Sequence, residues 1–106
     1  MKPNLLKIKE MERHALAASG LLKQLANSNR LMILCRLVQG EETVGGLVEH
    51  VGLAQSAVSQ HLSRLKDAGL VTAEKRGQQV YYALAGDEAK AVLAVLYKIY
   101  CGGELR

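Results

Sequence analysis

The sequence predicts a mostly α-helical domain with one small β-hairpin. Hydrophobic residues make up 49% of the 106 residues, yet Trp and Phe are absent, so Leu, Val, Ile and Ala must supply the core. Along most of the chain these residues recur every three or four positions, which is the helical period. Between residues 71 and 84, two short alternating runs flank a glycine, as in a hairpin. A chain of this length predicts a single domain, residues 1–106.

Charge and composition narrow the class of function. The net charge of +4 favours a polyanionic partner such as nucleic acid. No apolar run approaches the roughly 20 residues that cross a bilayer, and the N-terminus does not resemble a signal peptide, so we expect a cytoplasmic protein without membrane contact. Because no acid–base or nucleophile constellation and no phosphate-binding glycine loop is present, we expect neither an enzyme nor a cofactor.

The first third of the chain predicts helices. Residues 5–26 have helical spacing, and Ser19-Gly20 is expected to break or bend that segment. Its apolar row packs either against another subunit or against the domain's own core. Asn27 can cap a second helix over residues 27–40, which is apolar on most sides and therefore central, with Cys35 on its buried stripe.

A helix-turn-helix follows. Thr43 can cap a short helix, and Gly52 suits the left-handed residue that ends it. The longer helix, Leu53 to Gly69, has a polar face opposite an apolar one. The apolar face consists of Val58, Leu62 and Leu65. Ala54 stands where Ser, Thr or Asp would stabilise this helix by about 1 kcal/mol, so Ser56 is the alternative cap.

The polar face of this longer helix predicts DNA recognition. Short amides and hydroxyls can bond base edges in the major groove, while cations and a helix N-terminus suit phosphates. With the hairpin tip, the candidate DNA-binding residues are Gln55, Ser56, Ser59, Gln60, His61, Ser63, Arg64, Lys75, Arg76 and Gln78. Among them, Ser56, Ser59 and Gln60 are the expected base contacts. The expected phosphate contacts are Arg64, Lys75 and Arg76.

The C-terminal third predicts the hairpin and a last helix. The hairpin turns at Gly77-Gln78, and Gly86-Asp87 caps a helix that ends at Cys101. This helix is apolar over a wide arc, which favours burial against a partner subunit. The order is thus α-α-α-α-α-β-β-α, a winged helix-turn-helix.

Three runs carry a family resemblance: LLKQLANSNRLMILCRL, VSQHLSRLKDAGLV and GQQVYYAL. They resemble the ArsR/SmtB family of bacterial dimeric repressors over nearly all of the chain. The resemblance implies a homodimeric winged helix-turn-helix with its first and last helices at the dimer interface. It also implies binding to a double-stranded, pseudo-palindromic operator through the helix that carries Ser56, Ser59 and Gln60, and release when an inducer is sensed.

The residues do not match the family's metal sensors. The founding members carry a Cys-x-Cys pair before the recognition helix, where this chain has TVGGLVEHV. Other members bind zinc through Asp and His of the last helix, which here contains no His. Since His14, His50 and His61 lie at no ligand spacing, we expect no metal site.

Cys35 and Cys101, in LMILCRL and VLYKIYCGG, resemble the persulfide-sensing branch, the BigR/SqrR-like regulators. The resemblance implies that a persulfide or polysulfide reacts with one thiol and that the second closes a crosslink containing extra sulfur, which releases the operator. Such chemistry needs a thiolate and a second sulfur within reach. The order of attack stays open, because burial opposes a thiolate at Cys35 and the helix C-terminus opposes one at Cys101.

Several alternatives remain. The trigger could be a peroxide-driven disulfide or a metal recruited by the two cysteines together with other ligands. There could also be no small-molecule trigger, with both cysteines inert in the core. A pure protein-interaction module is a further alternative, which leaves the basic hairpin unexplained.

Overall fold

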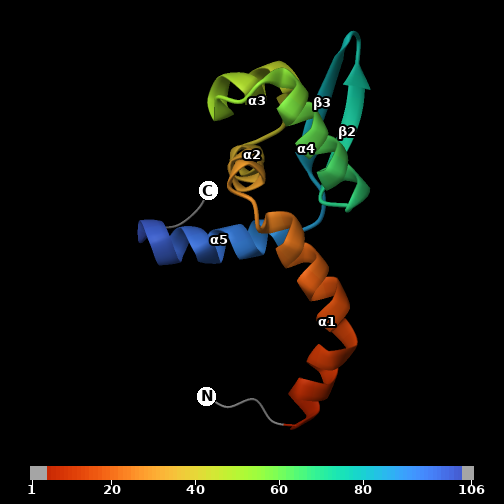
Figure 1. Cartoon of the computed structure of the whole chain (residues 1–106), viewed down its shortest axis with the longest axis vertical. Helices are drawn as coiled ribbons and strands as arrows, with labels where there is room; N and C mark the ends of the chain where they lie inside the picture. The colour runs from red at the N-terminus through yellow and green to blue at the C-terminus, as the bar shows by residue number, and fades with distance from the viewer. Residues whose placement is uncertain (1–4, 104–106) are drawn as a thin grey trace.

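A computed structural model describes residues 5–103 of the chain as a helical body with a three-stranded sheet on one side (Figure 1). The elements are α1 (Leu5–Leu25), α2 (Ser28–Val38), β1 (Glu42–Thr43), α3 (Val44–Val51), α4 (Gln55–Asp67), β2 (Val71–Arg76), β3 (Gln79–Leu84) and α5 (Glu88–Cys101). The predicted mostly helical fold with a hairpin is confirmed. Residues 1–4 and 104–106, which belong to the predicted single domain, lie outside the described residues.

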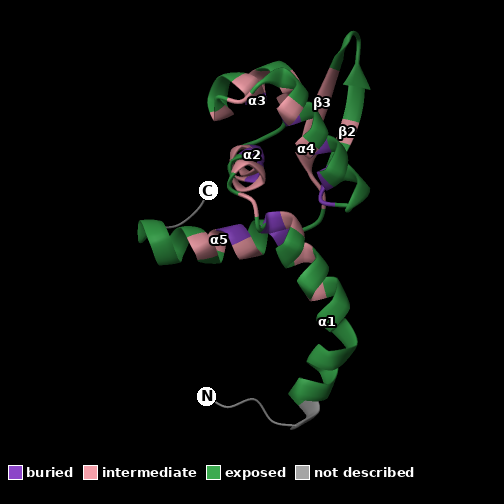
Figure 2. Cartoon of the chain, in the orientation of Figure 1, coloured by how far each residue is buried: buried purple, intermediate pink, exposed green. Residues whose placement is uncertain are grey.

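The core lies between α2, α3, α4, α5 and the sheet. Its fully buried side chains are Ile33, Leu34, Leu47, Val58, Leu62, Leu65 and Leu93. The predicted apolar face of α4 therefore packs inward. Burying Leu side chains of this kind stabilises a domain by about 1.5 to 3 kcal/mol each. Figure 2 shows buried positions on α2, α4 and α5, and it shows α1 exposed over most of its length.

Two details of the predicted order are wrong. Residues 5–25 form one continuous helix through Ser19-Gly20, so four helices, not five, precede the hairpin. Gly20 weakens a helix by only about 1 kcal/mol relative to Ala, which the neighbouring turns offset. The sequence also did not predict β1, which pairs with β3 through Glu42 opposite Tyr82 and Thr43 opposite Tyr81. The sheet order is β1-β3-β2, all antiparallel.

The helix ends test the predicted caps. Asn27 accepts a hydrogen bond from the Arg30 amide at 3.0 Å, and Thr43 accepts one from the Gly46 amide at 3.1 Å, as expected. Gly52 is left-handed, with φ 77°, and ends α3. Ser56 lies inside α4 and does not cap it, because Ala54 occupies the cap position.

The last helix also departs from its predicted cap. Asp87 stands at the N-cap of α5 but makes no side-chain capping bond.

Two helices leave apolar side chains uncovered. On α1 these are Ile8, Met11, Leu16 and Leu22, and on α5 they are Val95, Tyr97, Ile99 and Tyr100. Leu16 is 87% exposed and Tyr100 is 82% exposed, which is unusual for such large apolar side chains. Within residues 5–103, none of the helices combines the length and the apolarity that a bilayer crossing requires.

Candidate nucleic-acid interface and thiol pair

The polar face of α4 is fully available to a partner. Gln55, Ser56, Ser59, Gln60, Ser63 and Arg64 are all exposed. Within the described residues, the side chains of Ser56, Ser59 and Gln60 form no hydrogen bonds. Their donors and acceptors are thus satisfied only by solvent, and a base edge can replace that solvent at little cost. The amides of the first turn of α4 likewise lack a side-chain cap.

His61 differs from the other candidates on α4 because it is half-buried. Its Nδ1 is buried and has no hydrogen-bond partner. Burial lowers the pKa of His61, and the charges of Arg30 and Arg64 lower it further. The ring is therefore neutral at physiological pH, and it lies beside two cations.

The hairpin carries the remaining candidates. Lys75, Arg76 and Gln78 are exposed, and Gly77 takes φ 61° in the turn. Arg76 is not free, however, because its guanidinium donates to both carboxylate oxygens of Glu41 at 2.5 and 2.9 Å and to Glu74 at 2.5 Å. It also lies 4.8 Å from the ring centre of Tyr81. A phosphate that binds Arg76 must therefore compete with Glu41 and Glu74.

The link between Arg76 and Glu41 was not visible in the sequence. The two residues are 35 positions apart, and β1 brings the loop that holds Glu41 alongside the hairpin. The Arg76 hydrogen bond lowers the pKa of Glu41, so the carboxylate stays charged even in mild acid. Of the three predicted phosphate contacts, only Arg64 and Lys75 have no carboxylate partner in residues 5–103.

The two cysteines lie in different surroundings. Cys35 is half-buried on α2 against the core, and Cys101 is exposed at the end of α5, which packs on α2. Burial raises the pKa of the Cys35 thiol, and the charge of Cys101 raises it further. Both are free thiols.

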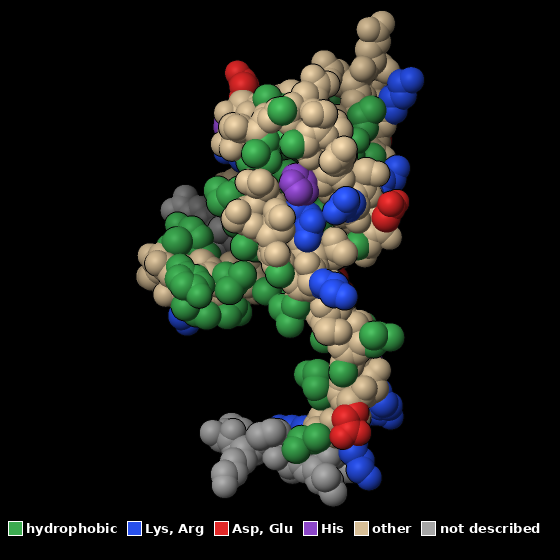
Figure 3. Space-filling model, viewed as in Figure 1, with side chains coloured by type: hydrophobic (Ala, Val, Ile, Leu, Met, Phe, Trp, Pro, Cys, Tyr) green, Lys and Arg blue, Asp and Glu red, His purple; other side chains and the backbone are tan. Residues whose placement is uncertain are grey.

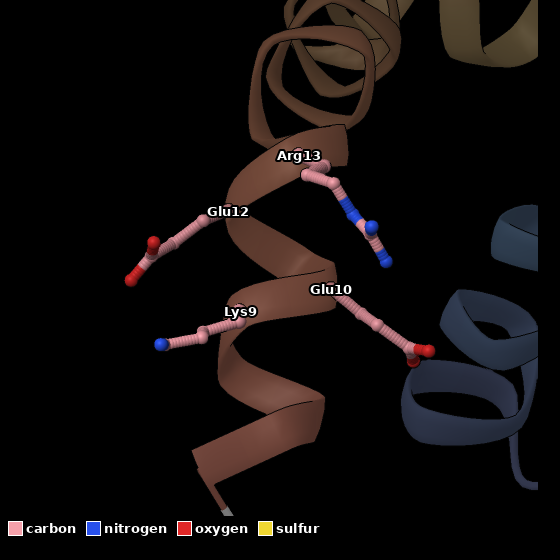
Figure 4. Close-up of a pocket in the computed structure, with 4 residues that line it drawn as sticks. All are labelled: Lys9, Glu10, Glu12 and Arg13. Carbon is pink, nitrogen blue, oxygen red and sulfur yellow. The ribbon is translucent and has the colours of Figure 1, made fainter.

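One charged site beside α1 has no enclosing geometry. A surface hollow beside α1 is lined by Lys9, Glu10, Glu12 and Arg13. Figure 4 shows that these side chains spread to opposite sides of a single helix and do not converge. In the same part of the chain, no three His, Cys, Asp or Glu side chains are grouped as metal ligands.

The fold and the free polar helix define a winged helix-turn-helix protein. Comparison with known proteins makes the assignment more specific. The family model described as "Bacterial regulatory protein, arsR family" matches residues 27–73. The transcriptional activator HlyU of Vibrio cholerae is 45% identical over 94 residues, which cover 89% of this chain and 87% of that protein. The biofilm growth-associated repressor of Agrobacterium fabrum is 40% identical over 94 residues, covering 89% and 80%.

Solved structures agree with these matches. The structure of BigR from Xylella fastidiosa superposes with a TM-score of 0.84 at 36% identity, covering 88% of this chain and 95% of that one. Reduced HlyU from Vibrio cholerae gives 0.81 at 45% identity, covering 88% and 98%. The chain belongs to the arsR family of bacterial regulatory proteins. It is a transcriptional regulator and not an enzyme.

Proposed function

We propose that this protein is a homodimeric repressor that binds a pseudo-palindromic operator through α4 and releases it when reactive sulfur links Cys35 to Cys101. The polar face of α4, without internal hydrogen bonds, supports DNA recognition. A named repressor among the relatives supports repression, although the Vibrio cholerae relative is named an activator. A transcription assay with and without the protein tests the direction of regulation.

The uncovered apolar rows of α1 and α5 support a homodimer. A relative from Mycobacterium bovis is described as a homodimeric winged helix-turn-helix domain. Fully burying an exposed Ile or Leu contributes about 1.5 to 3 kcal/mol before the entropic cost of association, and several such residues are present. In a two-fold dimer the two α4 helices must enter successive major grooves, whose centres are roughly 34 Å apart.

The thiol pair is the single observation that supports the sensor. Cys101 is exposed, whereas the pKa of Cys35 is raised by burial and by the charge of Cys101. We therefore propose that Cys101 reacts first: its thiolate takes the outer sulfur of a persulfide, and the reduced thiolate of that persulfide leaves. If Cys35 acquires sulfur in the same way, the two cysteine persulfides condense to a trisulfide with loss of hydrogen sulfide.

The crosslink would act through the packing of α2 against α5. Cys35 lies on the central helix and Cys101 on a proposed dimer helix, so a bond between them restricts the angle between core and interface. Because that angle sets the spacing of the two α4 helices, even a small change in the angle weakens binding to both operator half-sites.

The test is operator binding by the wild type and by Cys35→Ser and Cys101→Ser, each before and after treatment with glutathione persulfide. The operator is obtained by selection from random duplexes. We expect the wild type to lose affinity after treatment and Cys35→Ser to hold added sulfur on Cys101 without losing affinity. We expect Cys101→Ser to add sulfur at Cys35 only slowly, because the pKa of that thiol is raised, and to keep its affinity. Mass spectrometry identifies inserted sulfur, and a parallel peroxide treatment tests the plain disulfide.

Two results would contradict the proposal. A crosslinked wild type that binds its operator as tightly as the reduced protein would exclude the switch. Crosslinks that contain no extra sulfur after persulfide treatment, and form equally with peroxide, would favour a general oxidant as the trigger.

A further inference from the structure

Three basic side chains surround a hollow where the end of α1, the start of α2 and the last turns of α4 meet. The hollow has a volume of about 510 Å³. Its lining residues are Lys23, Gln24, Arg30, Arg64, Asp67 and Ala68. Figure 3 shows basic side chains gathered beside a histidine on the face of the body that it presents, just above the junction with α1. The sequence pattern had suggested neither Lys23 nor Arg30 as a DNA contact.

The backbone of α1 holds Arg30 in place. Its Nε donates to the carbonyl oxygen of Gln24 at 2.7 Å, and its Nη2 donates to that of Lys23 at 3.3 Å. These acceptors are neutral, so the guanidinium keeps its charge. Across residues 5–103, no carboxylate lies within ion-pair distance of Lys23, Arg30 or Arg64. Arg76, by contrast, is already neutralised by Glu41 and Glu74.

His61 responds to the positive potential of this cluster. The charges of Arg30 and Arg64 add to burial in lowering the pKa of His61. The positive potential that disfavours protonation of the imidazole also favours the binding of an anion beside it. Asp67, the one carboxylate that lines the hollow, leaves a net charge of +2 from three cations and one anion.

We propose that Lys23, Arg30 and Arg64 form a phosphate-binding site that holds the DNA backbone at the end of α4 remote from the hairpin tip. The proposal rests on the proposed DNA binding by α4. In Figure 1 the hairpin tip lies at one end of the body and the junction of α1 and α2 lies beyond the other end of α4. Contacts at both ends would fix the register of α4 in the major groove. Arginine forks and a lysine ammonium both suit phosphate oxygens.

The experiment measures binding of a fluorescent duplex of random sequence at a series of salt concentrations, because phosphate contacts do not depend on sequence. Lys23→Gln is the variant that tests the phosphate site, because it removes one positive charge and keeps the hydrogen bonds of Arg30 to the backbone. We expect it to lower the slope of log affinity against log salt by roughly 0.9, the value for one phosphate contact. Lys90→Gln, on the exposed surface of α5, is the matched control and should keep the wild-type slope.

Arg30 requires a pair of variants, because its loss also removes two bonds to α1. Arg30→Lys keeps the charge without the fork, and Arg30→Gln loses both. We expect Arg30→Lys to keep the wild-type salt slope and Arg30→Gln to have a lower one. Thermal melting checks that both variants fold.

The outcomes distinguish a failure of the phosphate site from a failure of the proposed DNA-binding function. If the wild type shows no salt-dependent duplex binding, the proposed DNA-binding function fails. If the wild type binds and Lys23→Gln keeps its slope, the phosphate site is wrong and the function stands. Inorganic phosphate that raises the melting temperature of the wild type but not of Lys23→Gln, with the slope unchanged, would assign the hollow to a free anion and overturn the proposal.

Discussion

The missing cap of α4 gives a prediction that separates stability from DNA binding. Ala54 has φ −62° and ψ 149°, the extended geometry of an N-cap, but no side chain that can accept from the first amides of the helix. Ala54→Asn and Ala54→Asp both supply such an oxygen, which stabilises a helix by about 1 kcal/mol. For a domain of this size we expect the melting temperature to rise by about 4 to 8 °C.

The two variants should differ in binding. Asp adds a negative charge at the positive end of α4, where we expect a DNA phosphate, and Asn has the same shape without the charge. We therefore expect Ala54→Asp to bind duplex DNA more weakly, with a salt slope lower by roughly 0.9, and Ala54→Asn to bind nearly as the wild type does. Fluorescence anisotropy and thermal melting measure the two effects. Equal duplex binding by both variants would refute a phosphate at this helix end, and no gain in melting temperature would refute the capping argument.

Three further predictions address the core, the wing and the thiols. Leu62 is fully buried, so Leu62→Ala should lower the free energy of unfolding by about 2 to 5 kcal/mol in urea titrations, and a loss near zero would contradict the packing. Glu41→Gln removes one of the two carboxylates that pair with Arg76 and leaves Glu74, so duplex binding at low salt should become tighter; unchanged binding would show that Arg76 does not contact DNA. Because the pKa of Cys35 is raised, its alkylation by iodoacetamide should be slower than that of Cys101 at neutral pH and should keep increasing beyond pH 9.0, the ordinary thiol pKa. Mass spectrometry measures the alkylation rates of the two cysteines, and equal rates at every pH would contradict this prediction.

Local signals in the sequence predicted most of the helix ends. Asn27 and Thr43 accept from amides three residues ahead, and Gly52 takes a left-handed conformation that other residues adopt at a cost. These interactions involve near neighbours in the chain, so the residue types alone indicate them. The same is true of the apolar face of α4, because helical spacing places its side chains on one side.

Features that depend on distant residues were missed. The strand β1 has only two residues, too few to show an alternating pattern, and it exists because β3 supplies its partner. The sequence predicted a break or a bend at Ser19-Gly20, and the break is wrong, since a weak residue does not stop a helix that extends on both sides.

By itself, the sequence determined the helices, the hairpin and the polar face of α4, because periodicity, caps and turns act over a few residues. The family was indicated by the resemblance of three sequence runs, which is also a property of the sequence alone. Only the tertiary structure decided which charges are available. It pairs Arg76 with Glu41. It places Arg30 and Arg64, which have no carboxylate partner among the described residues, near His61, and it lets the charge of Cys101 raise the pKa of Cys35. The physical reason is that the field at a side chain depends on neighbours in space, and the chain order does not reveal those neighbours.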